Sequence, residues 1–272
     1  MRVGICQFAA IPGHVGGNAT EMMRLLEEGQ RGGADMLCFP ELSLPGYLLD
    51  RASYTPALLG NLQRAEEDVR STAQSLGVGV VYGTARASRR GLQNVVVMYS
   101  ASAHEWVYAK SHLPAPEREV FAPGDAIVSA DGEWALGCCY DLAFPQFCAA
   151  LADSGARAFL FPMAWECERA YVYEQLVGAR AIENLAYVIC SNQTGDIGAL
   201  SFYGRSRIVD PWGEVVARMG RETGVICAEI DLSLVVALRD RGDARAYPLL
   251  ADRRPLDRNP QSSAAGQAWS RT

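Results

Sequence analysis

The 272-residue sequence lacks the long apolar runs and the basic clusters that mark membrane and nucleic-acid-binding proteins. No stretch reaches the roughly 18 uninterrupted apolar residues that a membrane-spanning helix needs. The net charge is −6, and no run of lysine and arginine provides the basic face that nucleic acid would select. The N-terminal residues MRVGICQFAA lack the apolar segment and small-residue cleavage site of a signal peptide. We therefore expect a cytoplasmic protein that binds neither nucleic acid nor a membrane.

Histidine is scarce, and cysteine follows no pattern that would build a metal site or a disulfide framework. His14, His104 and His112 are the three histidines, and they have no ligand spacing. The eight cysteines include no C-x-x-C pair, and most lie in apolar runs, where a free thiol behaves as a small hydrophobe. We expect no metal and no organic cofactor, and free thiols fit a reducing compartment.

The chain also shows no internal repeat, and its length favours one large domain. Hydrophobic residues make up 49% of the sequence, enough for a core that can bury a charged site. We assign residues 1–256 to a single domain. Residues 257–272 (DRNPQSSAAGQAWSRT) are rich in serine, alanine and glutamine, and we expect them to form a mobile tail.

Helical and strand patterns alternate early in the chain, and strand hairpins follow in its middle and late parts. The first helix is expected to begin with Asn18 as N-cap and Glu21 completing a capping box, and to end at Gly32-Gly33. Further helices are expected at 61–75, 145–154, 169–184 and 232–239. Strands are expected at 3–9, 35–39, 78–86, 93–99, 104–109, 133–139, 157–161, 186–191, 202–209, 214–218 and 223–230. This mixture predicts an α/β sandwich with sheets inside and helices outside.

Three strand ends carry a reactive side chain beside glycine or proline. They are Glu41 in FPELSLPGY, Lys110 in YAKSHLPAPEREVFAPG and Cys139 in GCCYDLAFP. Reactive groups at strand ends of an α/β protein commonly face a shared crevice. A thiol at a strand-to-helix turn also has unpaired backbone N–H groups nearby, which favour a thiolate and stabilise an oxyanion. Because neighbours on a strand point to opposite faces, we expect only one of Cys138 and Cys139 to meet such a site.

In chain order, the blocks FPEL…GY, YxKxHL and CYDxxFP resemble those of the nitrilase (carbon–nitrogen hydrolase) superfamily. The stretches PEREVFAPGD, ARAIEN (179–184), GxSxIxDPxG (204–213) and YPxLxDRRP (247–255) agree, so the resemblance covers about residues 3–255. It implies an α-β-β-α sandwich whose subunits pair across helices into a four-layer αββα-αββα core. A homodimer or a larger homo-oligomer is therefore expected. Gln146 departs from the glutamate usual in the family, at a position we expect to affect packing or subunit contact.

The family's Glu–Lys–Cys triad falls on Glu41, Lys110 and Cys139, and its second glutamate matches Glu117. The physical roles agree with this assignment. A free thiol has a pKa near ~8.5 and needs activation, so Glu41 would accept its proton and Cys139 would attack an amide carbonyl. Lys110 and the N–H of Tyr140 would stabilise the oxyanion, and Cys139 would carry a thioester. Two carboxylates, Glu41 and Glu117, would pair the buried ammonium of Lys110.

The Cys-Tyr-Asp sequence at the nucleophile favours the amidase and carbamoylase branches over true nitrilases, which tend to carry Cys-Trp-Glu. The expected substrate is a small amide or an N-carbamoyl amine. In PMAWECERAY, Trp165 would line the pocket, Glu166 or Glu168 would pair a substrate amine, and Arg169 would bind a substrate carboxylate. The competing interpretation is that Glu168 and Arg169 only begin the next helix.

Other interpretations stay open at this point. The same site would serve nitrile hydrolysis, or acyl transfer to an amine in place of water. The fold would also suit a non-catalytic binding subunit, although the intact triad argues against it. His112 would be the base of a Cys–His hydrolase. Asp141 is expected to cap the following helix rather than to take part in the chemistry.

Overall fold

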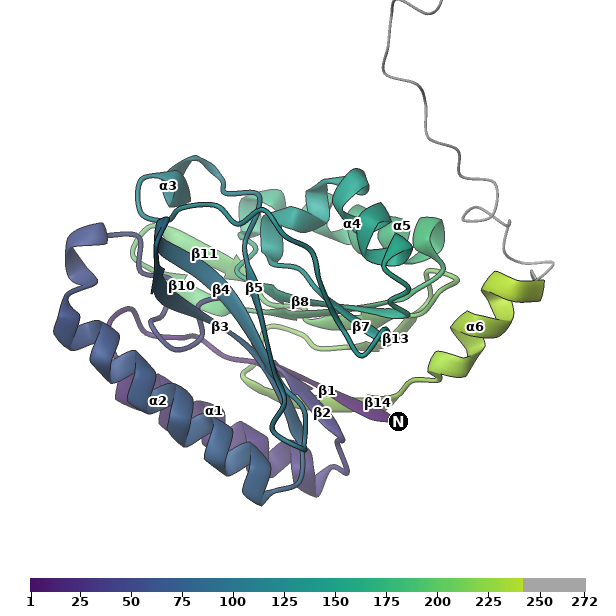
Figure 1. The fold of residues 1–272 in the computed structure, drawn as a ribbon, viewed down its shortest axis with the longest axis horizontal. Helices are drawn as coiled ribbons and strands as arrows, with labels where there is room; N and C mark the ends of the chain where they lie inside the picture. The colour runs from purple at the N-terminus through teal and green to yellow at the C-terminus, as the bar shows by residue number, and fades with distance from the viewer. Residues whose placement is uncertain (242–272) are drawn as a thin grey trace, which may run out of the picture.

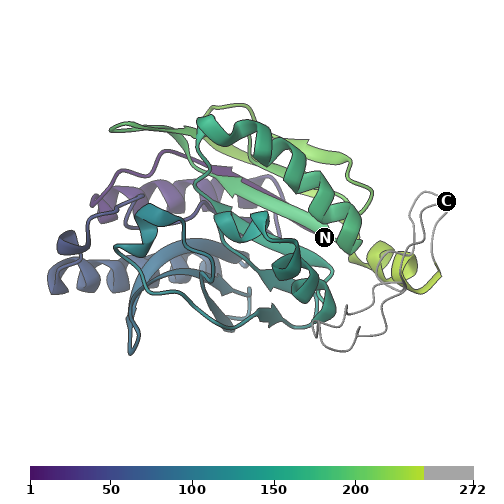
Figure 2. The same cartoon turned by 90° about the horizontal axis from the view of Figure 1, so that it is seen from above.

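The computed structural model describes residues 1–241, and these residues form two six-stranded sheets packed face to face with helices on their outer faces (Figure 1). Helices α1 and α2 cover the first sheet, and α4 and α5 cover the second. Figure 2 shows α4 and α5 side by side over the second sheet. The α-β-β-α sandwich predicted from the sequence is confirmed.

The first sheet has the strand order β14-β1-β2-β3-β4-β5. Its three central strands are parallel, as in α/β units, and the outer pairs are antiparallel. The bounds are β1 (Arg2–Gln7), β2 (Met36–Cys38), β3 (Gly79–Ser88), β4 (Gly91–Tyr99), β5 (Glu105–Ala109) and β14 (Gly224–Glu229).

The second sheet has the order β13-β12-β9-β8-β7-β6, and its central strands β7, β8 and β9 are again parallel. Its bounds are β6 (Val128–Ala130), β7 (Trp134–Leu136), β8 (Ala158–Met163), β9 (Tyr187–Asn192), β12 (Arg207–Val209) and β13 (Val215–Arg218). A separate hairpin joins β10 (Thr194–Ile197) to β11 (Leu200–Tyr203). Strand ends of the two sheets meet, since the hydroxyl of Ser191 at the end of β9 donates to the carbonyl of Cys38 at the end of β2.

The helices lie close to the positions expected from apolar periodicity. Their bounds are α1 (Val15–Arg31), α2 (Pro56–Ser75), α3 (Ala115–Arg118), α4 (Pro145–Asp153), α5 (Ala170–Asn184) and α6 (Leu232–Arg241). Three 3₁₀ turns complete the set, η1 (Arg51–Ser53), η2 (Cys139–Ala143) and η3 (Cys167–Arg169). Among the described residues, no helix is long and apolar enough to cross a membrane.

Strand alternation separates two cores. On β4, Val95 and Val97 pack against the layer of α1 and α2, whereas Val96 and Met98 face the second sheet. Every second position on this strand therefore faces the space between the sheets. Asn94 occupies one of these inward positions, and its side chain is fully buried.

Two local predictions are wrong. Helix α1 begins at Val15, and Asn18 lies inside it rather than at its N-cap. The Asn18 side chain instead bonds the backbone of Ile11 and Leu44, so its amide secures a loop. The strand expected at 202–209 is split, because Gly204 and Arg205 both adopt positive φ angles, 63° and 51°.

Some predictions lie outside the described residues. They are the YPxLxDRRP stretch, the end of the domain at residue 256 and the mobile tail from residue 257.

Candidate active site

Glu41 lies in a sharp turn after β2, where contacts from the second sheet fix its backbone. Its N–H donates to the carbonyl of Met163 at 3.3 Å, and its carbonyl accepts the side-chain amide of Gln193 at 2.9 Å. The next residue, Leu42, has a φ of 48°. Gly83 on β3 lies so close that a Cβ there would come within 2.2 Å of the Leu42 nitrogen. The sequence FPEL therefore folds into a turn that contacts β3 of the first sheet and residues at the strand ends of the second sheet.

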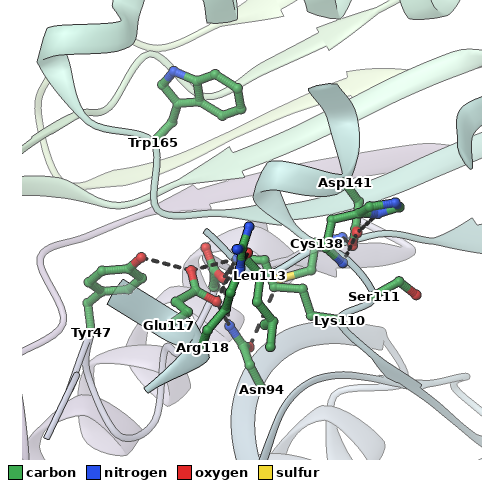
Figure 3. Close-up of polar contacts among 12 residues, drawn as sticks. Tyr47, Asn94, Lys110, Ser111, Leu113, Glu117, Arg118, Cys138, Asp141 and Trp165 are labelled. Atoms are coloured by element: carbon green, nitrogen blue, oxygen red, sulfur yellow. Dashed lines mark hydrogen bonds and ion pairs between the residues drawn. The ribbon is translucent and has the colours of Figure 1, made fainter. Parts of the chain in front are cut away.

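Lys110 follows β5 on the same face as Tyr108 and reaches into the space between the sheets. Its Nζ donates to Glu41 Oε1 at 2.6 Å. It also donates to both carboxylate oxygens of Glu117, at 2.7 and 2.9 Å (Figure 3). Glu117 comes from the short helix α3. All three side chains are within 1% of complete burial. The structure thus brings together three of the residues that the sequence singled out.

The charges in this cluster shift one another's pKa values. Burial by itself lowers the pKa of Lys110, but the carboxylates of Glu117 and Glu41 outweigh burial and raise it well above its usual range. The two carboxylates therefore favour the charged ammonium form of Lys110. Burial and the neighbouring Glu41 carboxylate raise the pKa of Glu117, and the Lys110 ammonium lowers it. Burial has the largest effect, and the pKa of Glu117 is raised overall. One ammonium between two buried carboxylates leaves a site that favours binding of a further proton.

Two residues that the sequence analysis missed complete the cluster. The Tyr47 hydroxyl donates to Glu117 Oε1 at 2.8 Å. The Asn94 side-chain amide donates to Glu41 Oε1 at 2.7 Å and to Glu117 Oε2 at 3.2 Å. Asn94 could have been singled out from the sequence, because it is a polar residue at an inward position of the apolar strand NVVVMY. Tyr47 stood in the FPELSLPGY block without being assigned a role.

The two oxygens of Glu41 differ. Oε1 accepts hydrogen bonds from Lys110, Asn94 and the thiol of Cys138. Oε2 is buried and has no hydrogen-bond partner among the described residues. A buried carboxylate oxygen without a donor is costly unless a ligand or a transferred proton satisfies it. Glu41 therefore presents one oxygen that is structurally fixed and one that is free to accept a proton.

The expectation that only one of the adjacent cysteines meets the site is wrong. Cys138 Sγ lies 3.3 Å from Glu41 Oε1, and Cys139 is close enough for Glu41, Lys110 and Glu117 to influence its thiol. Strand β7 ends at Leu136, and Cys139 begins the turn η2 with a φ of 42°, so strand alternation no longer applies. Burial raises the pKa of both thiols, Glu41 raises it further and Lys110 lowers it.

A backbone hydrogen bond from Ala164, just after β8, also favours the Cys139 thiolate. The pKa of both thiols is nevertheless raised well above its usual value. A resting thiol in this site is therefore protonated, and it needs a neighbouring base to become a nucleophile.

Asp141 secures the turn that carries Cys139. Its Oδ2 accepts the N–H of Cys138 at 3.0 Å and the hydroxyl of Tyr108 at 2.7 Å. Its Oδ1 accepts the backbone N–H of His112 and contacts His112 Nδ1 at 2.7 Å. The role predicted for Asp141 is structural, as expected, but Asp141 does not cap the following helix: α4 begins after Phe144 without a side-chain cap, and Asp141 instead holds the turn η2. His112 is held by Asp141 and stacked on Phe144. Among the described residues no hydrogen bond joins His112 to a thiol, which removes support from a Cys–His site.

Trp165, Glu166 and Tyr140 were also predicted to contribute to the pocket. The indole of Trp165 donates to the Arg169 carbonyl at 2.8 Å and lies apart from the charged cluster in Figure 3. Glu166 forms an ion pair with Arg169. The ring of Tyr140 packs edge-on against Phe144. The three residues are not hydrogen-bonded to the charged cluster through their side chains, and their contact with substrate remains a prediction.

No group of three or more potential metal ligands occurs within residues 1–241. The described cluster contains thiols, two carboxylates, an ammonium, a side-chain amide and a phenol hydroxyl.

Comparison with known proteins places this site in a family. The carbon–nitrogen hydrolase family model matches residues 2–240. The chain therefore belongs to the carbon–nitrogen hydrolase family, and it is an enzyme that acts on carbon–nitrogen bonds. The family predicted from the ordered sequence blocks is confirmed.

Similar proteins include two named amidases and one solved structure. The chain is 34% identical to the 2-oxoglutaramate amidase of Bacillus subtilis over 76% of this chain and 82% of that protein. It is 30% identical to an (R)-stereoselective amidase of Pseudomonas sp. over 93% of this chain and 92% of that protein. An amidase from Nesterenkonia sp. AN1, in a form with acrylamide added at its active-site cysteine, superposes with a TM-score of 0.78. That pair is 25% identical, with 89% of this chain and 96% of the other covered.

Proposed function

We propose that this carbon–nitrogen hydrolase is an amidase that converts a small-molecule amide, or an N-carbamoyl amine, into an acid and ammonia through a thioester on Cys139. The observation that carries the proposal is the buried, partnerless Oε2 of Glu41, in a cluster that also influences the Cys139 thiol. A free carboxylate oxygen beside a protonated thiol is what a base-activated nucleophile requires. The named amidase relatives support the same class of substrate.

The first half of the reaction forms the thioester. Glu41 Oε2 takes the proton of the Cys139 thiol, and the sulfur attacks the amide carbonyl carbon. The ammonium of Lys110 and the N–H of Tyr140 stabilise the negative oxygen of the tetrahedral intermediate. When the carbon–nitrogen bond breaks, Glu41 returns the proton to the departing nitrogen, and ammonia leaves.

The second half hydrolyses the thioester. Glu41, again a carboxylate, takes a proton from a water molecule, and the resulting hydroxide attacks the thioester carbonyl. The carbon–sulfur bond breaks, the sulfur regains the proton from Glu41, and the carboxylic acid departs. Glu117 is poorly suited to the role of base, because each of its oxygens already accepts two hydrogen bonds. We assign it the task of holding the Lys110 ammonium.

Acyl transfer to an amine is the second candidate function, because a thioester reacts with any nucleophile that replaces water. No described contact favours an amine over water, since Glu166, a residue predicted to pair an amine, is already paired with Arg169. Hydrolysis is therefore the stronger proposal. Nitrile hydrolysis would use the same residues, but the amidase relatives support an amide substrate.

We also propose that the enzyme is a homo-oligomer built through the face of α5. Tyr171 and Ile182 on this helix are 77% and 45% exposed, although both are large and hydrophobic. Such side chains on one outer helix suit burial against a second copy of the chain. An Ile182→Glu variant should then elute later than wild type in size-exclusion chromatography with light scattering, and an unchanged mass would argue against this interface. The eight free thiols support a reducing, cytoplasmic setting.

The function is tested by ammonia release from the purified protein over small amides, N-carbamoyl amines and nitriles. Release from amides or carbamoyl amines, together with trapping of an acyl group on Cys139 by mass spectrometry, would support the proposal. Added amine acceptors would reveal acyl transfer as new amide products. If no substrate releases ammonia and no acyl group appears on Cys139, the proposed function is wrong.

A further inference from the structure

Asn94 places an amide inside an otherwise apolar face of strand β4. On this face it precedes Val96 and Met98, which pack in the core between the sheets. The Asn94 side chain is 0% exposed. Burying an amide costs free energy unless its donor and acceptor groups find partners. The position would suit a branched apolar residue, so the amide there calls for a physical explanation.

The contacts of Asn94 reach every charged residue of the site. Its Nδ2 donates to Glu41 Oε1 at 2.7 Å and to Glu117 Oε2 at 3.2 Å, which uses both of its N–H groups. Its backbone carbonyl accepts the N–H of Lys110 at 2.9 Å. Its Oδ1 lies 4.0 Å from the thiol of Cys138. One residue thus joins the two carboxylates through its side chain and the lysine through its backbone.

The Asn94 amide stabilises two carboxylates that are buried close together. Two buried carboxylates repel each other, and the three donors of Lys110 are already used, one on Glu41 and two on Glu117. A neutral amide with two N–H groups adds one donor to each carboxylate without adding charge. Because the amide occupies Oε1 of Glu41, it also holds the carboxylate in the rotation that leaves Oε2 free.

We propose that Asn94 is a positioning residue that sets the distance between Glu41 and Glu117 and holds Glu41 Oε2 ready to take the proton of Cys139. This inference rests on the proposed function, since it assigns Glu41 the role of base. Without the two donors, Glu41 shifts relative to the thiol, and misplacement of a reacting group by ~1 Å costs on the order of 100-fold in rate.

The test compares Asn94→Leu with Val96→Ala. Leucine has the same branched arrangement of side-chain heavy atoms as asparagine but no donor, and Val96→Ala weakens the same face of the same strand without touching the charged cluster. We expect Asn94→Leu to lower kcat about 100-fold with KM changed less than about threefold. Val96→Ala should lower the unfolding temperature while kcat stays within about threefold. Asn94→Gln, which keeps the amide, should recover part of the lost kcat. If Asn94→Leu does not fold, Asn94→Ala provides the same loss of donors.

A second readout does not need a substrate. The rate at which iodoacetamide alkylates Cys139, followed by mass spectrometry, reports whether a base takes the thiol proton. We expect this rate to fall at least about tenfold in Asn94→Leu and to be unchanged in Val96→Ala. If wild type hydrolyses no amide but the alkylation difference appears, the substrate assignment is wrong and the role of Asn94 stands. If amides are hydrolysed and Asn94→Leu matches wild type in kcat and alkylation, the role of Asn94 is wrong and the function stands.

Discussion

Cys138 Sγ and Glu41 Oε1 lie 3.3 Å apart, so the carboxylate that we assign as the base contacts the thiol that we do not assign as the nucleophile. The contact occupies the oxygen that Lys110 and Asn94 already bond. The other oxygen, Oε2, has no partner among the described residues. Cys138 therefore contacts the fixed oxygen of Glu41, and the proton transfer that we propose for Cys139 would use the other oxygen.

The two cysteines should separate cleanly in a mutational test. Cys139→Ala should abolish ammonia release, because the proposed nucleophile is the Cys139 thiol, which begins the turn η2, where backbone N–H groups can stabilise an oxyanion. Cys138→Ala should retain activity within about tenfold, because Glu41 Oε1 keeps two of its three donors. Initial rates on the best amide substrate measure both effects. The assignment is reversed if Cys138→Ala is inactive and Cys139→Ala is not.

Lys110→Met should destabilise the fold by at least about 3 kcal/mol near pH 8, because it leaves two buried carboxylates without their ammonium. The pKa of Lys110 is raised in the folded protein, so its stabilisation is complete below its unfolded pKa of ~10.4 and is lost only as the pH rises through the higher folded value. Titration of Lys110 itself should therefore leave the penalty unchanged from about pH 8 to 9.5. Urea unfolding of both proteins across this range measures it.

At lower pH the same penalty should shrink. Lys110 lowers the pKa of Glu117, which burial and Glu41 raise, so removing the lysine moves this pKa further upward. Glu117 then takes up a proton in the folded variant at a pH where wild type does not, and the variant gains stability as the pH falls. A penalty that grows on acidification would contradict this charge assignment.

The sequence predicted much of the molecule, and the reasons for its failures are physical. The ordered blocks around Glu41, Lys110 and Cys139 identified the family, and the 3.6- and 2-residue periodicities placed the layers. The proximity of both cysteines to Glu41 was not predictable from strand alternation, because the strand ends at Leu136 and the backbone turns through a positive φ at Cys139.

Asn18 and Asn94 show a second kind of failure. The capping-box pattern at Asn18 is real in the sequence, but the loop carbonyls of Ile11 and Leu44 bind its amide instead. Asn94 is visible as a polar residue in an apolar strand, yet its partners lie 53 and 23 residues away along the chain. A pattern within a short window predicts an element and its inward face, but it cannot identify a partner brought close by folding.

Tyr47→Phe should lower kcat about tenfold with little effect on the fold. The change removes only the hydroxyl that bonds Glu117 Oε1, while the ring keeps its edge contact with Phe202. A hydrogen bond to a charged group contributes about 1.5–3 kcal/mol, part of which orients Glu117 and through it Lys110. Tyr54→Phe is the matched control, since its hydroxyl bonds the Leu48 carbonyl and its kcat should stay near wild type. Equal losses in the two variants would show that the effect is not specific to Glu117.

Gly83→Ala should damage the site through the backbone that carries the base. A Cβ at this position would come within 2.2 Å of the Leu42 nitrogen and 2.6 Å of the Glu41 Cα, and neither backbone atom can rotate away. The turn must shift, so we expect a loss of stability of about 1–3 kcal/mol and a fall in kcat of roughly 100-fold. Gly60→Ala on helix α2 is the control, since a Cβ there meets only the end of the Arg64 side chain at 3.9 Å, and alanine should stabilise the helix by up to ~1 kcal/mol. Ammonia release and thermal unfolding of the two variants, measured side by side, decide the matter. Full activity in Gly83→Ala would mean that the position of Glu41 does not limit the rate, and the role of Glu41 as the base would then have to be abandoned.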